Sequence, residues 1–205
     1  TEATFEIDNI LWRADAGYEP PPSTGGDTVN FDNLNGEGNT SPTSYPGMTL
    51  AWSDEFEGTS LNGQLWNHDI GGWGWGNNES QAYTSDPANS FVEEGNLFIV
   101  ALQDGAGYTS ARMVTRDLQE FDHGRIDIRA VLPYGQGLWP ALWMLGANHS
   151  EIGWPECGEI DIMEMIGGAT PNQGDERVHG TGHWSSNGNH AYTGGSIVVP
   201  NGSSY

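Results

Sequence analysis

The sequence contains no lysine, and its basic residues are six arginines set against 28 aspartates and glutamates, which gives a formal net charge of −22 at pH 7. Because binding to phosphates requires cations on the protein surface, this balance argues against nucleic acid or an anionic membrane as a partner. Solubility alone accounts for such a surface and is the favoured explanation. Adaptation to salty surroundings, where ions screen the self-repulsion, is the alternative.

Cysteine and long apolar runs are also scarce. Cys157 is the only cysteine, so no disulfide can form within the chain. No run of 18 apolar residues exists, which excludes a membrane-spanning helix in this sequence. Apolar residues never recur at helical spacing over ten or more positions, and 30 glycines would interrupt such a helix.

Short apolar runs separated by Gly, Asn and Pro turns are what the sequence does contain from Met48 onward. Many short strands with frequent turns favour an all-β fold, an antiparallel sandwich or barrel. Nine tryptophans supply material for a core. The predicted strands span residues 49–53, 96–102, 111–116, 124–132, 139–145, 158–166 and 177–184.

The stretch GEIDIMEM, residues 158–165, places three acids among residues that favour a strand. Strict alternation would put Glu159 and Asp161 on one face and Glu164 on the opposite one. A single bulged residue at Met163 would reset the alternation and bring the three acids together. The other face would then carry the apolar side chains Ile160, Ile162 and Met165.

Three carboxylates on one face repel each other, so a purely structural role does not explain them. A calcium site, a solvated edge face and paired-carboxylate catalysis are the competing accounts. Calcium usually collects its ligands from loops. Catalysis fits the geometry better, because two Glu side chains leaning inward on a curved strand can approach the separation of about 5–5.5 Å that a retaining glycosidase needs. Asp161 would hold a proton or orient the nucleophile, and its charge would keep the acid protonated.

Aromatic side chains around these acids fit a sugar ligand, although for any single tryptophan core packing is the alternative. Trp73 and Trp75 favour ligand contact, because the glycine-rich loop at 71–79 offers little core to bury them. Asn77, Glu79 and Arg112 are polar residues that could bind sugar hydroxyls. The candidate sugar contacts are Trp73, Trp75, Asn77, Glu79, Arg112, Trp139, Trp143, Trp154 and Trp184.

Six blocks of sequence, in this order, resemble the bacterial laminarinases, the endo-β-1,3-glucanases of glycoside hydrolase family 16. They are LAWSDEFEGTSLN, GGWGWGNNESQAYT, YTSARMVT, HGRIDIRAVLPYGQGLWPALWML, GWPECGEIDIMEMIG and VHGTGHW. The E-x-D-x-x-E spacing is similar to that of the bulged laminarinase branch, whereas lichenases carry E-x-D-x-E. The resemblance implies a concanavalin-like jelly-roll β-sandwich of two curved antiparallel sheets, and retaining endo-hydrolysis of β-1,3-glucan.

The same resemblance assigns roles to residues of this chain. It implies that Glu159 is the nucleophile, that Asp161 assists it and that Glu164 is the general acid/base. His183 matches the family histidine beside the leaving-group subsite. The implied substrate contacts are Trp139, Trp143 and Arg112, with Glu79 and Trp75 on the glycone side.

Catalysis in this family needs no cofactor, but the resemblance implies a structural calcium held partly by carbonyls near Glu57 and Gly95. Gly182 stands where such sequences often have a larger apolar residue, which loosens the strand or widens the adjacent subsite. The family continues into further strands beyond Tyr205. We therefore expect the C-terminal strands to be missing and the calcium site to be incomplete.

FEIDNILW, within residues 1–13, is similar to the closing strand of carbohydrate-binding jelly-roll modules. We expect a remnant strand of such a module at 1–13, a Pro/Gly/Ser-rich linker at 14–47 and a catalytic domain at 48–205. The predicted protein is a secreted, extracellular monomer that acts on β-1,3-glucan. The alternatives are another β-glucan or a marine galactan as substrate, or a catalytically dead glucan-binding fragment.

Overall fold

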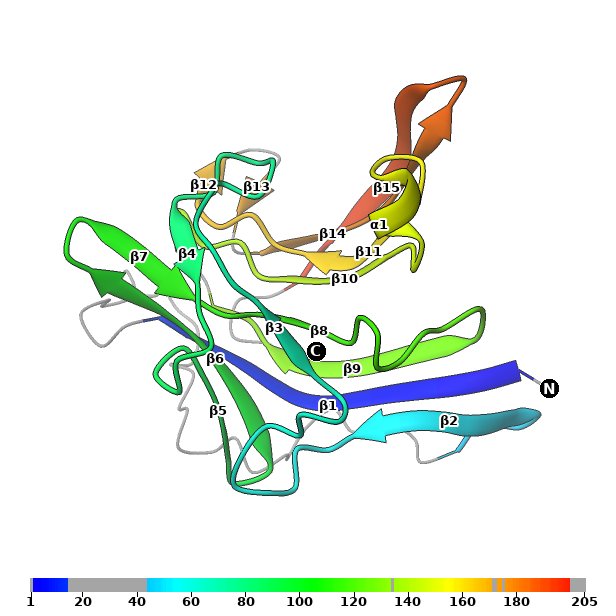
Figure 1. Ribbon diagram of the computed structural model, residues 1–205, viewed down its shortest axis with the longest axis horizontal. Helices are drawn as coiled ribbons and strands as arrows, with labels where there is room; N and C mark the ends of the chain where they lie inside the picture. The colour runs from blue at the N-terminus through cyan, green and yellow to red at the C-terminus, as the bar shows by residue number, and fades with distance from the viewer. Residues whose placement is uncertain (1, 15–43, 134, 171–172, 175, 200–205) are drawn as a thin grey trace. The chain divides into compact units, whose positions relative to one another are not determined.

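The computed structural model is built almost entirely of strands, which form two compact units (Figure 1). Unit 1 takes in the described residues up to Leu132, and unit 2 takes in those from Pro133 onward. The structure describes residues 2–14, 44–133, 135–170, 173–174 and 176–199.

Unit 1 contains nine strands. They are β1 (Glu2–Ala14), β2 (Met48–Asp54), β3 (Asn67–Asp69), β4 (Gln81–Tyr83), β5 (Ser90–Glu93), β6 (Asn96–Asp104), β7 (Gly107–Ser110), β8 (Arg112–Val114) and β9 (Arg125–Val131). Seven of them form one sheet in the order β2-β1-β6-β7-β4, with β5 beside β6 and β9 beside β1. The remaining two, β3 and β8, pair with each other.

β1 pairs in parallel with β2, β6 and β9, so this sheet is mixed and not antiparallel as expected. Strands that are joined by a long connection are free to pair in parallel, whereas a tight hairpin forces an antiparallel pair. The structure thus confirms a strand near residues 1–13 and pairs it within unit 1. Its origin in another module stays a prediction, and most of the predicted linker, residues 15–43, lies outside the described residues.

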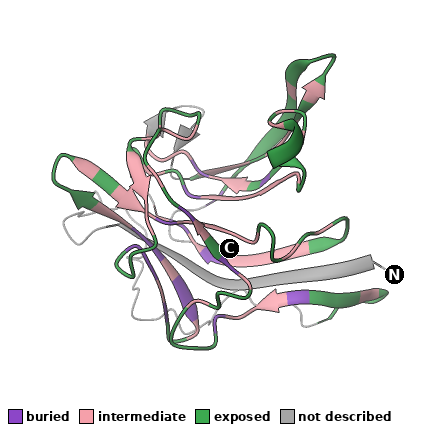
Figure 2. Ribbon diagram, viewed as in Figure 1, coloured by how far each residue is buried: buried purple, intermediate pink, exposed green. Residues whose placement is uncertain are grey.

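Purple segments of the ribbon in Figure 2 mark the buried residues, and three of the buried residues of unit 1, Trp52, Phe56 and Trp66, are aromatic. Trp52 on β2 lies edge-on to Trp66 and to Phe121, with centroids 5.8 Å away in each case. The indole N–H of Trp66 donates to Oδ2 of Asp54 at 2.7 Å, so the polar atom of this buried ring is satisfied. Leu97 on β6 is 1% exposed, which places this strand at the centre of the sheet.

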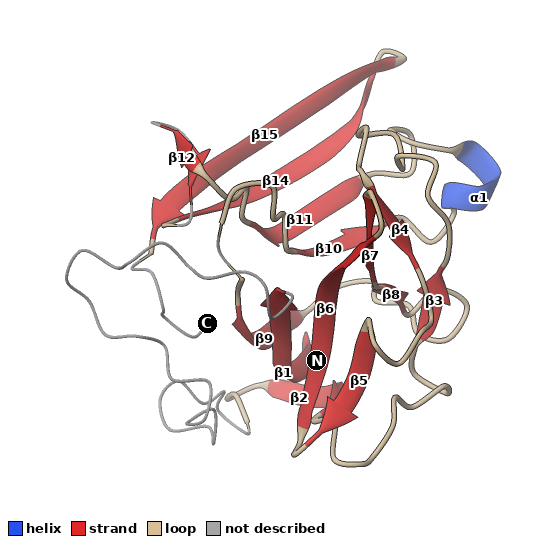
Figure 3. Ribbon diagram, turned by 90° about the vertical axis from the view of Figure 1, so that its left-hand side faces the viewer, coloured by secondary structure: helices blue, strands red, loops and turns tan. Residues whose placement is uncertain are grey.

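Unit 2 consists of a short helix and six strands. They are β10 (Ala141–Leu145), α1 (His149–Ile152), β11 (Glu159–Glu164), β12 (Ala169–Thr170), β13 (Gln173–Gly174), β14 (Arg177–Ser186) and β15 (Asn189–Val198). β10, β11, β14 and β15 lie side by side in that order in an antiparallel sheet (Figure 3). In the part of the chain that the structure describes, no helix is long and apolar enough to cross a membrane.

Candidate active site

The bulge predicted in the acidic strand is present in β11. On β10, Leu142 pairs with Met163 and the next residue, Trp143, pairs with Asp161, so Ile162 is the extra residue. The register against β14 shifts over the same segment. The insertion therefore lies one position earlier than the predicted Met163. This shift does not alter its effect, because one extra residue is enough to reverse the alternation beyond it.

The three acids share one face of the four-stranded sheet, as predicted. On β14, Glu159 lies opposite His183, Asp161 opposite Thr181 and Glu164 opposite His179. Those three partners alternate along a strand whose pairing with β15 is continuous, so they point to the same side. On the other face, Ile160 is 57% exposed, whereas Met165, just beyond the strand, is 2% exposed.

Glu164 has the environment of a general acid. Burial, and after it the negative charge of Asp161, raise the pKa of its carboxyl group, so the protonated form persists to higher pH. The indole N–H of Trp139 donates to Oε1 of Glu164 at 2.9 Å, and this bond opposes the rise because it stabilises the carboxylate. Trp139 is 44% exposed and so remains open to a ligand.

Asp161 is buried, at 5% exposed, and it interacts with both Glu159 and His183. Burial and then the charge of Glu159 raise its pKa, and the contact with His183 opposes that rise. Nε2 of His183 lies 2.9 Å from Oδ2 of Asp161. Ligand-type atoms of Glu159, Asp161 and His183 all lie within 4.8 Å of one another. Hydrogen bonding accounts for this closeness, and we assign no metal to it.

A second histidine and two further rings surround His183. Nδ1 of His183 lies 2.9 Å from Nε2 of His190 on β15. The His190 ring is 4.6 Å from that of Trp154 and 5.7 Å from that of Tyr192, measured between centroids. The sequence analysis identified Trp154 and His183 but missed His190 and Tyr192. The signal was present in Asn187-Gly188, a dipeptide typical of a two-residue hairpin turn, which would have predicted β15.

Trp143 and Trp184, two other predicted sugar contacts, lie on opposite faces of the four-stranded sheet. Trp143 pairs with Asp161 across β10 and β11, so it shares the face of the acids. Trp184 follows His183 directly on a regular strand, and it therefore points to the opposite face. The expectation that Trp184 joins the aromatic surroundings of the acids is corrected by this register. Its exposure of 42% comes from the other side of the sheet.

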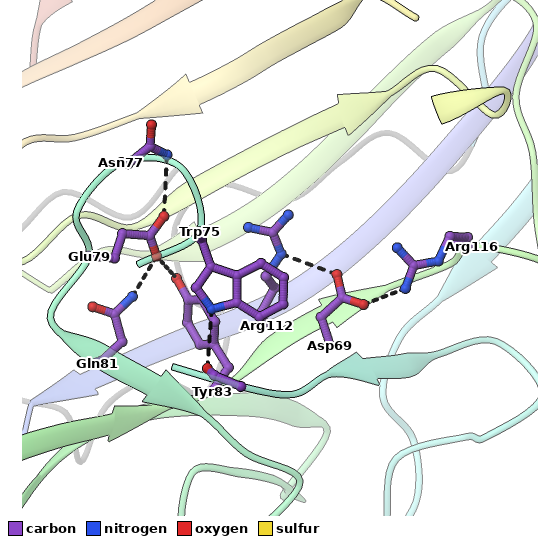
Figure 4. A network of polar contacts seen from close by, with 9 residues as sticks. Asp69, Trp75, Asn77, Glu79, Gln81, Tyr83, Arg112 and Arg116 are labelled. Carbon is purple, nitrogen blue, oxygen red and sulfur yellow. Dashed lines mark hydrogen bonds and ion pairs between the residues drawn. The ribbon is translucent and has the colours of Figure 1, made fainter. Parts of the chain in front are cut away.

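The glycine-rich loop of unit 1 presents the predicted pair of tryptophans. Trp73 is 69% exposed, and its ring lies 4.3 Å from that of Trp75. Gly71 permits this arrangement, because a Cβ there would lie 1.8 Å from the Trp73 ring. The guanidinium of Arg112 lies 4.5 Å from the centroid of Trp75, and its Nε donates to Oδ2 of Asp69 at 3.3 Å (Figure 4).

Glu79 accepts hydrogen bonds from three neighbours, one in the same loop and two on β4 (Figure 4). The hydroxyl of Tyr83 donates at 2.8 Å, the amide of Gln81 at 2.7 Å and the amide of Asn77 at 3.3 Å. Burial and the bond to Glu79 raise the pKa of Tyr83, so its hydroxyl stays a donor. Asn77, Glu79, Trp75 and Arg112 thus belong to one rigid polar and aromatic network of unit 1.

The calcium predicted near Glu57 and Gly95 stays a prediction. Glu57 is exposed, and Gly95 lies in the turn between β5 and β6 with a φ of +72°. The amide of Asn96 already donates to the carbonyl of Glu94 in that turn at 2.8 Å. Among the described residues, Glu57 belongs to no cluster of three acid, histidine or cysteine side chains.

Comparisons with known proteins point to one family. A family profile described as "XgeA-like, catalytic GH16 domain" matches residues 97–195. The beta-glucanase of Rhodothermus marinus is 44% identical over 165 residues, which cover 76% of this chain and 56% of that protein. Glucan endo-1,3-beta-glucosidase A1 of Niallia circulans is 38% identical over 177 residues, which cover 78% of this chain and 25% of that protein. The chain therefore spans only part of the length of these relatives.

A solved structure of a laminarinase domain is also similar to this chain. The laminarinase catalytic domain from Thermotoga maritima matches with a TM-score of 0.62 and 43% identity, over 76% of this chain and 64% of that one. Strands, bulge and acids together define an all-β glycoside hydrolase domain of the jelly-roll class. The chain belongs to glycoside hydrolase family 16.

Proposed function

We propose that this chain is the catalytic part of an endo-acting β-1,3-glucan hydrolase that retains the anomeric configuration. The observation that carries the proposal is the bulged strand β11, which aligns Glu159, Asp161 and Glu164 on one face with His183 beside them. Relatives named glucan endo-1,3-beta-glucosidase and laminarinase support β-1,3-glucan as the substrate.

In the first step, a carboxylate oxygen of Glu159 attacks the anomeric carbon, and the bond from that carbon to the glycosidic oxygen breaks. Glu164 gives its proton to the departing oxygen. Its raised pKa suits this role, because the group must be protonated when the sugar binds. The products of the step are a glucan with a new non-reducing end, which keeps the protonated glycosidic oxygen, and a glycosyl ester on Glu159.

In the second step, ionised Glu164 takes a proton from water, and the water oxygen attacks the anomeric carbon. The ester bond breaks and the Glu159 carboxylate is regenerated. Two inversions at one carbon give net retention. Asp161 lies close to Glu159 and is held by His183. It therefore orients the nucleophile and offsets part of the change in charge that Glu159 undergoes between carboxylate and ester.

Trp73, Trp75 and the Glu79 and Arg112 network of unit 1 are proposed as sugar contacts. Exposed tryptophan faces stack on the apolar faces of pyranose rings, while fixed carboxylate and guanidinium groups bind hydroxyls. Further parts of the proposal are secretion, a monomeric state and catalysis without a cofactor. A structural calcium near Glu57 and Gly95 stays a prediction.

The test uses laminarin and a reducing-end assay. Glu159→Gln keeps the size of the side chain but removes the nucleophile, so release of reducing ends should disappear. Glu151→Gln in α1 is the matched control, because Glu151 is exposed, and it should leave the rate unchanged. Unchanged release by Glu159→Gln would reject the mechanism.

Glu164→Gln separates the two carboxylates. It should lower kcat on laminarin by about 10²–10⁴-fold, since general acid catalysis is lost. An aryl β-glucoside with a good leaving group needs little protonation, so formation of its glycosyl ester should be largely spared. If both substrates were affected equally, Glu164 would not be the acid.

A further inference from the structure

The contacts of His190 extend the active site to the surface of unit 2. Asp161, His183 and His190 form an unbroken chain: Oδ2 of Asp161 to Nε2 of His183 at 2.9 Å, and Nδ1 of His183 to Nε2 of His190 at 2.9 Å. Asp161 is 5% exposed, the side chain of His183 is 19% exposed, and His190 is classed as exposed. The chain therefore leads from a buried carboxyl group to solvent.

Each contact in this chain carries one proton, which leaves two self-consistent arrangements. When Asp161 is ionised, Nε2 of His183 donates to it, and Nδ1 of His183 accepts from Nε2 of His190. When Asp161 is protonated, it donates to Nε2 of His183, and Nδ1 of His183 donates to Nε2 of His190. His190 then carries its own proton on Nδ1.

Conversion of the first arrangement into the second takes up one proton from water at Nδ1 of His190. The proton on Nε2 of His190 moves to Nδ1 of His183, and the proton on Nε2 of His183 moves to Asp161. Both imidazoles are neutral before and after the transfer, and Asp161 changes from carboxylate to carboxylic acid. The reverse sequence returns the proton to solvent.

The surroundings hold the two imidazoles in place. His183 and His190 are stacked with centroids 5.1 Å apart, between the rings of Trp154 and Tyr192. The charged groups that face them are Glu159, Asp161 and Glu164 from β11 and Glu156 from the loop before it, which accepts a hydrogen bond from Ser185 beside His190 at 3.4 Å. All four are acids, so a proton entering at His190 meets a favourable potential.

We propose that His190 is a positioning residue at the solvent end of a proton relay, through which Asp161 gains and loses its proton as the charge of Glu159 changes during glucan hydrolysis. The inference rests on the proposed function. While Glu159 is a carboxylate, a proton on Asp161 relieves the repulsion between the two carboxyl groups. When Glu159 is an ester it carries no charge, and Asp161 no longer needs the proton. The relay lets this exchange occur without opening the buried acid to water.

The first arm of the test needs no catalysis. Nitrogen-15 NMR of the histidine rings in the 205-residue chain, followed from pH 5 to pH 9, reports which nitrogen of His183 carries the proton. His190→Phe keeps an aromatic ring in the stack but removes both ring nitrogens. We expect the protonation pattern of His183 to change in this variant and to stay native in His149→Phe, an exposed histidine of α1. A native His183 pattern in His190→Phe would overturn the relay.

The second arm measures laminarin hydrolysis. His190→Phe should lower kcat roughly 10-fold, as loss of an outer partner of an active-site imidazole does, with KM within about twofold. The acidic limb of the kcat profile should move, and added imidazole should restore part of the rate of His190→Ala but not raise that of His149→Ala. An equal loss at every pH, without rescue, would make His190 merely structural. If the native chain did not hydrolyse laminarin at all, the proposed function would fail, and the NMR arm would still decide the relay.

Discussion

At the scale of single residues, the site is defined by which protons its carboxyl groups hold. Glu164 and Asp161 both have raised pKa values, and burial is the main cause in each case. Neighbouring groups oppose the rise: for Glu164 the indole of Trp139 and, after it, His183 and His179, and for Asp161 His183. These neighbours are therefore the residues through which the pH profile can be changed without removing an acid.

Trp139→Phe tests this balance. The general acid works only while protonated, so kcat/KM falls as the pH rises through the pKa of Glu164. Loss of the indole donor removes a bond that stabilises the carboxylate, so that pKa rises further and the alkaline limb of the profile moves to higher pH. The measurement is kcat/KM for laminarin between pH 5 and pH 10.

The control for this prediction is Trp154→Phe. Trp154 contacts His183 and His190 and does not contribute to the pKa shift of Glu164, so the alkaline limb should stay where it is. An alkaline limb that stays in place or moves to lower pH in Trp139→Phe would contradict the role given to the indole.

At the scale of elements, the hairpin of β14 and β15 supports the acidic strand, and two of its glycines differ in the space around them. A Cβ on Gly182 would meet nothing within 4 Å, whereas a Cβ on Gly194 would lie 2.7 Å from the carbonyl oxygen of Gly180. Both glycines lie within paired strands.

Gly182→Ala and Gly194→Ala are therefore a matched pair with opposite expected signs. Alanine at 182 should raise the free energy of unfolding by about 0.5–1 kcal/mol, because glycine inside a strand loses more entropy on folding. Alanine at 194 should lower it by about 1–3 kcal/mol through overpacking against backbone. Urea unfolding with an unchanged m value measures both. Equal effects of the two substitutions would show that the available space does not decide stability here.

Much of the strand pattern could be predicted from the sequence, because short apolar runs with β-branched residues, bounded by turn residues, are strong signals. The strands predicted at 49–53, 96–102, 111–116, 124–132, 139–145, 158–166 and 177–184 are confirmed as β2, β6, β8, β9, β10, β11 and β14. β3, β4, β5 and β7 were missed, since three or four residues give too little periodicity. β15 was missed for another reason, because its exposed, glycine-containing sequence hides the alternation.

The acidic part of the site could also be predicted, because the five-residue offset from Glu159 to Glu164 is incompatible with a regular strand on one face. The partners of these acids could not. The contact between His183 and His190 depends on a register across β14 and β15, which local sequence does not specify without the hairpin. Trp184 was assigned wrongly to the acidic surroundings because closeness in sequence was taken for closeness in space.

At the scale of the whole molecule, the dominant feature is a net charge of −22 at pH 7. Repulsion among like charges destabilises the folded chain, and salt screens it over a Debye length that falls from about 10 Å at 0.1 M to about 3 Å at 1 M. We expect the melting temperature at pH 7 to rise by roughly 2–4 °C over this range, corresponding to about 1 kcal/mol.

The same titration near pH 4 is the control, since the isoelectric point of the sequence is about 4.1 and little net charge remains to be screened. The rise with sodium chloride should be absent or much smaller there. A melting temperature that responded equally at both pH values would assign the effect to general salting-out and not to the acidic surface.

Retention is the central claim about this molecule, because it follows from a nucleophile and an acid/base on one bulged strand. The most direct measurement is proton NMR of the anomeric signals during the first minutes of laminarin hydrolysis by the native chain. Retention predicts that the β-anomer of the new reducing end appears first and that the α-anomer grows in later by mutarotation. Initial release of the α-anomer would contradict the account, because it would require water, and not Glu159, to attack the sugar.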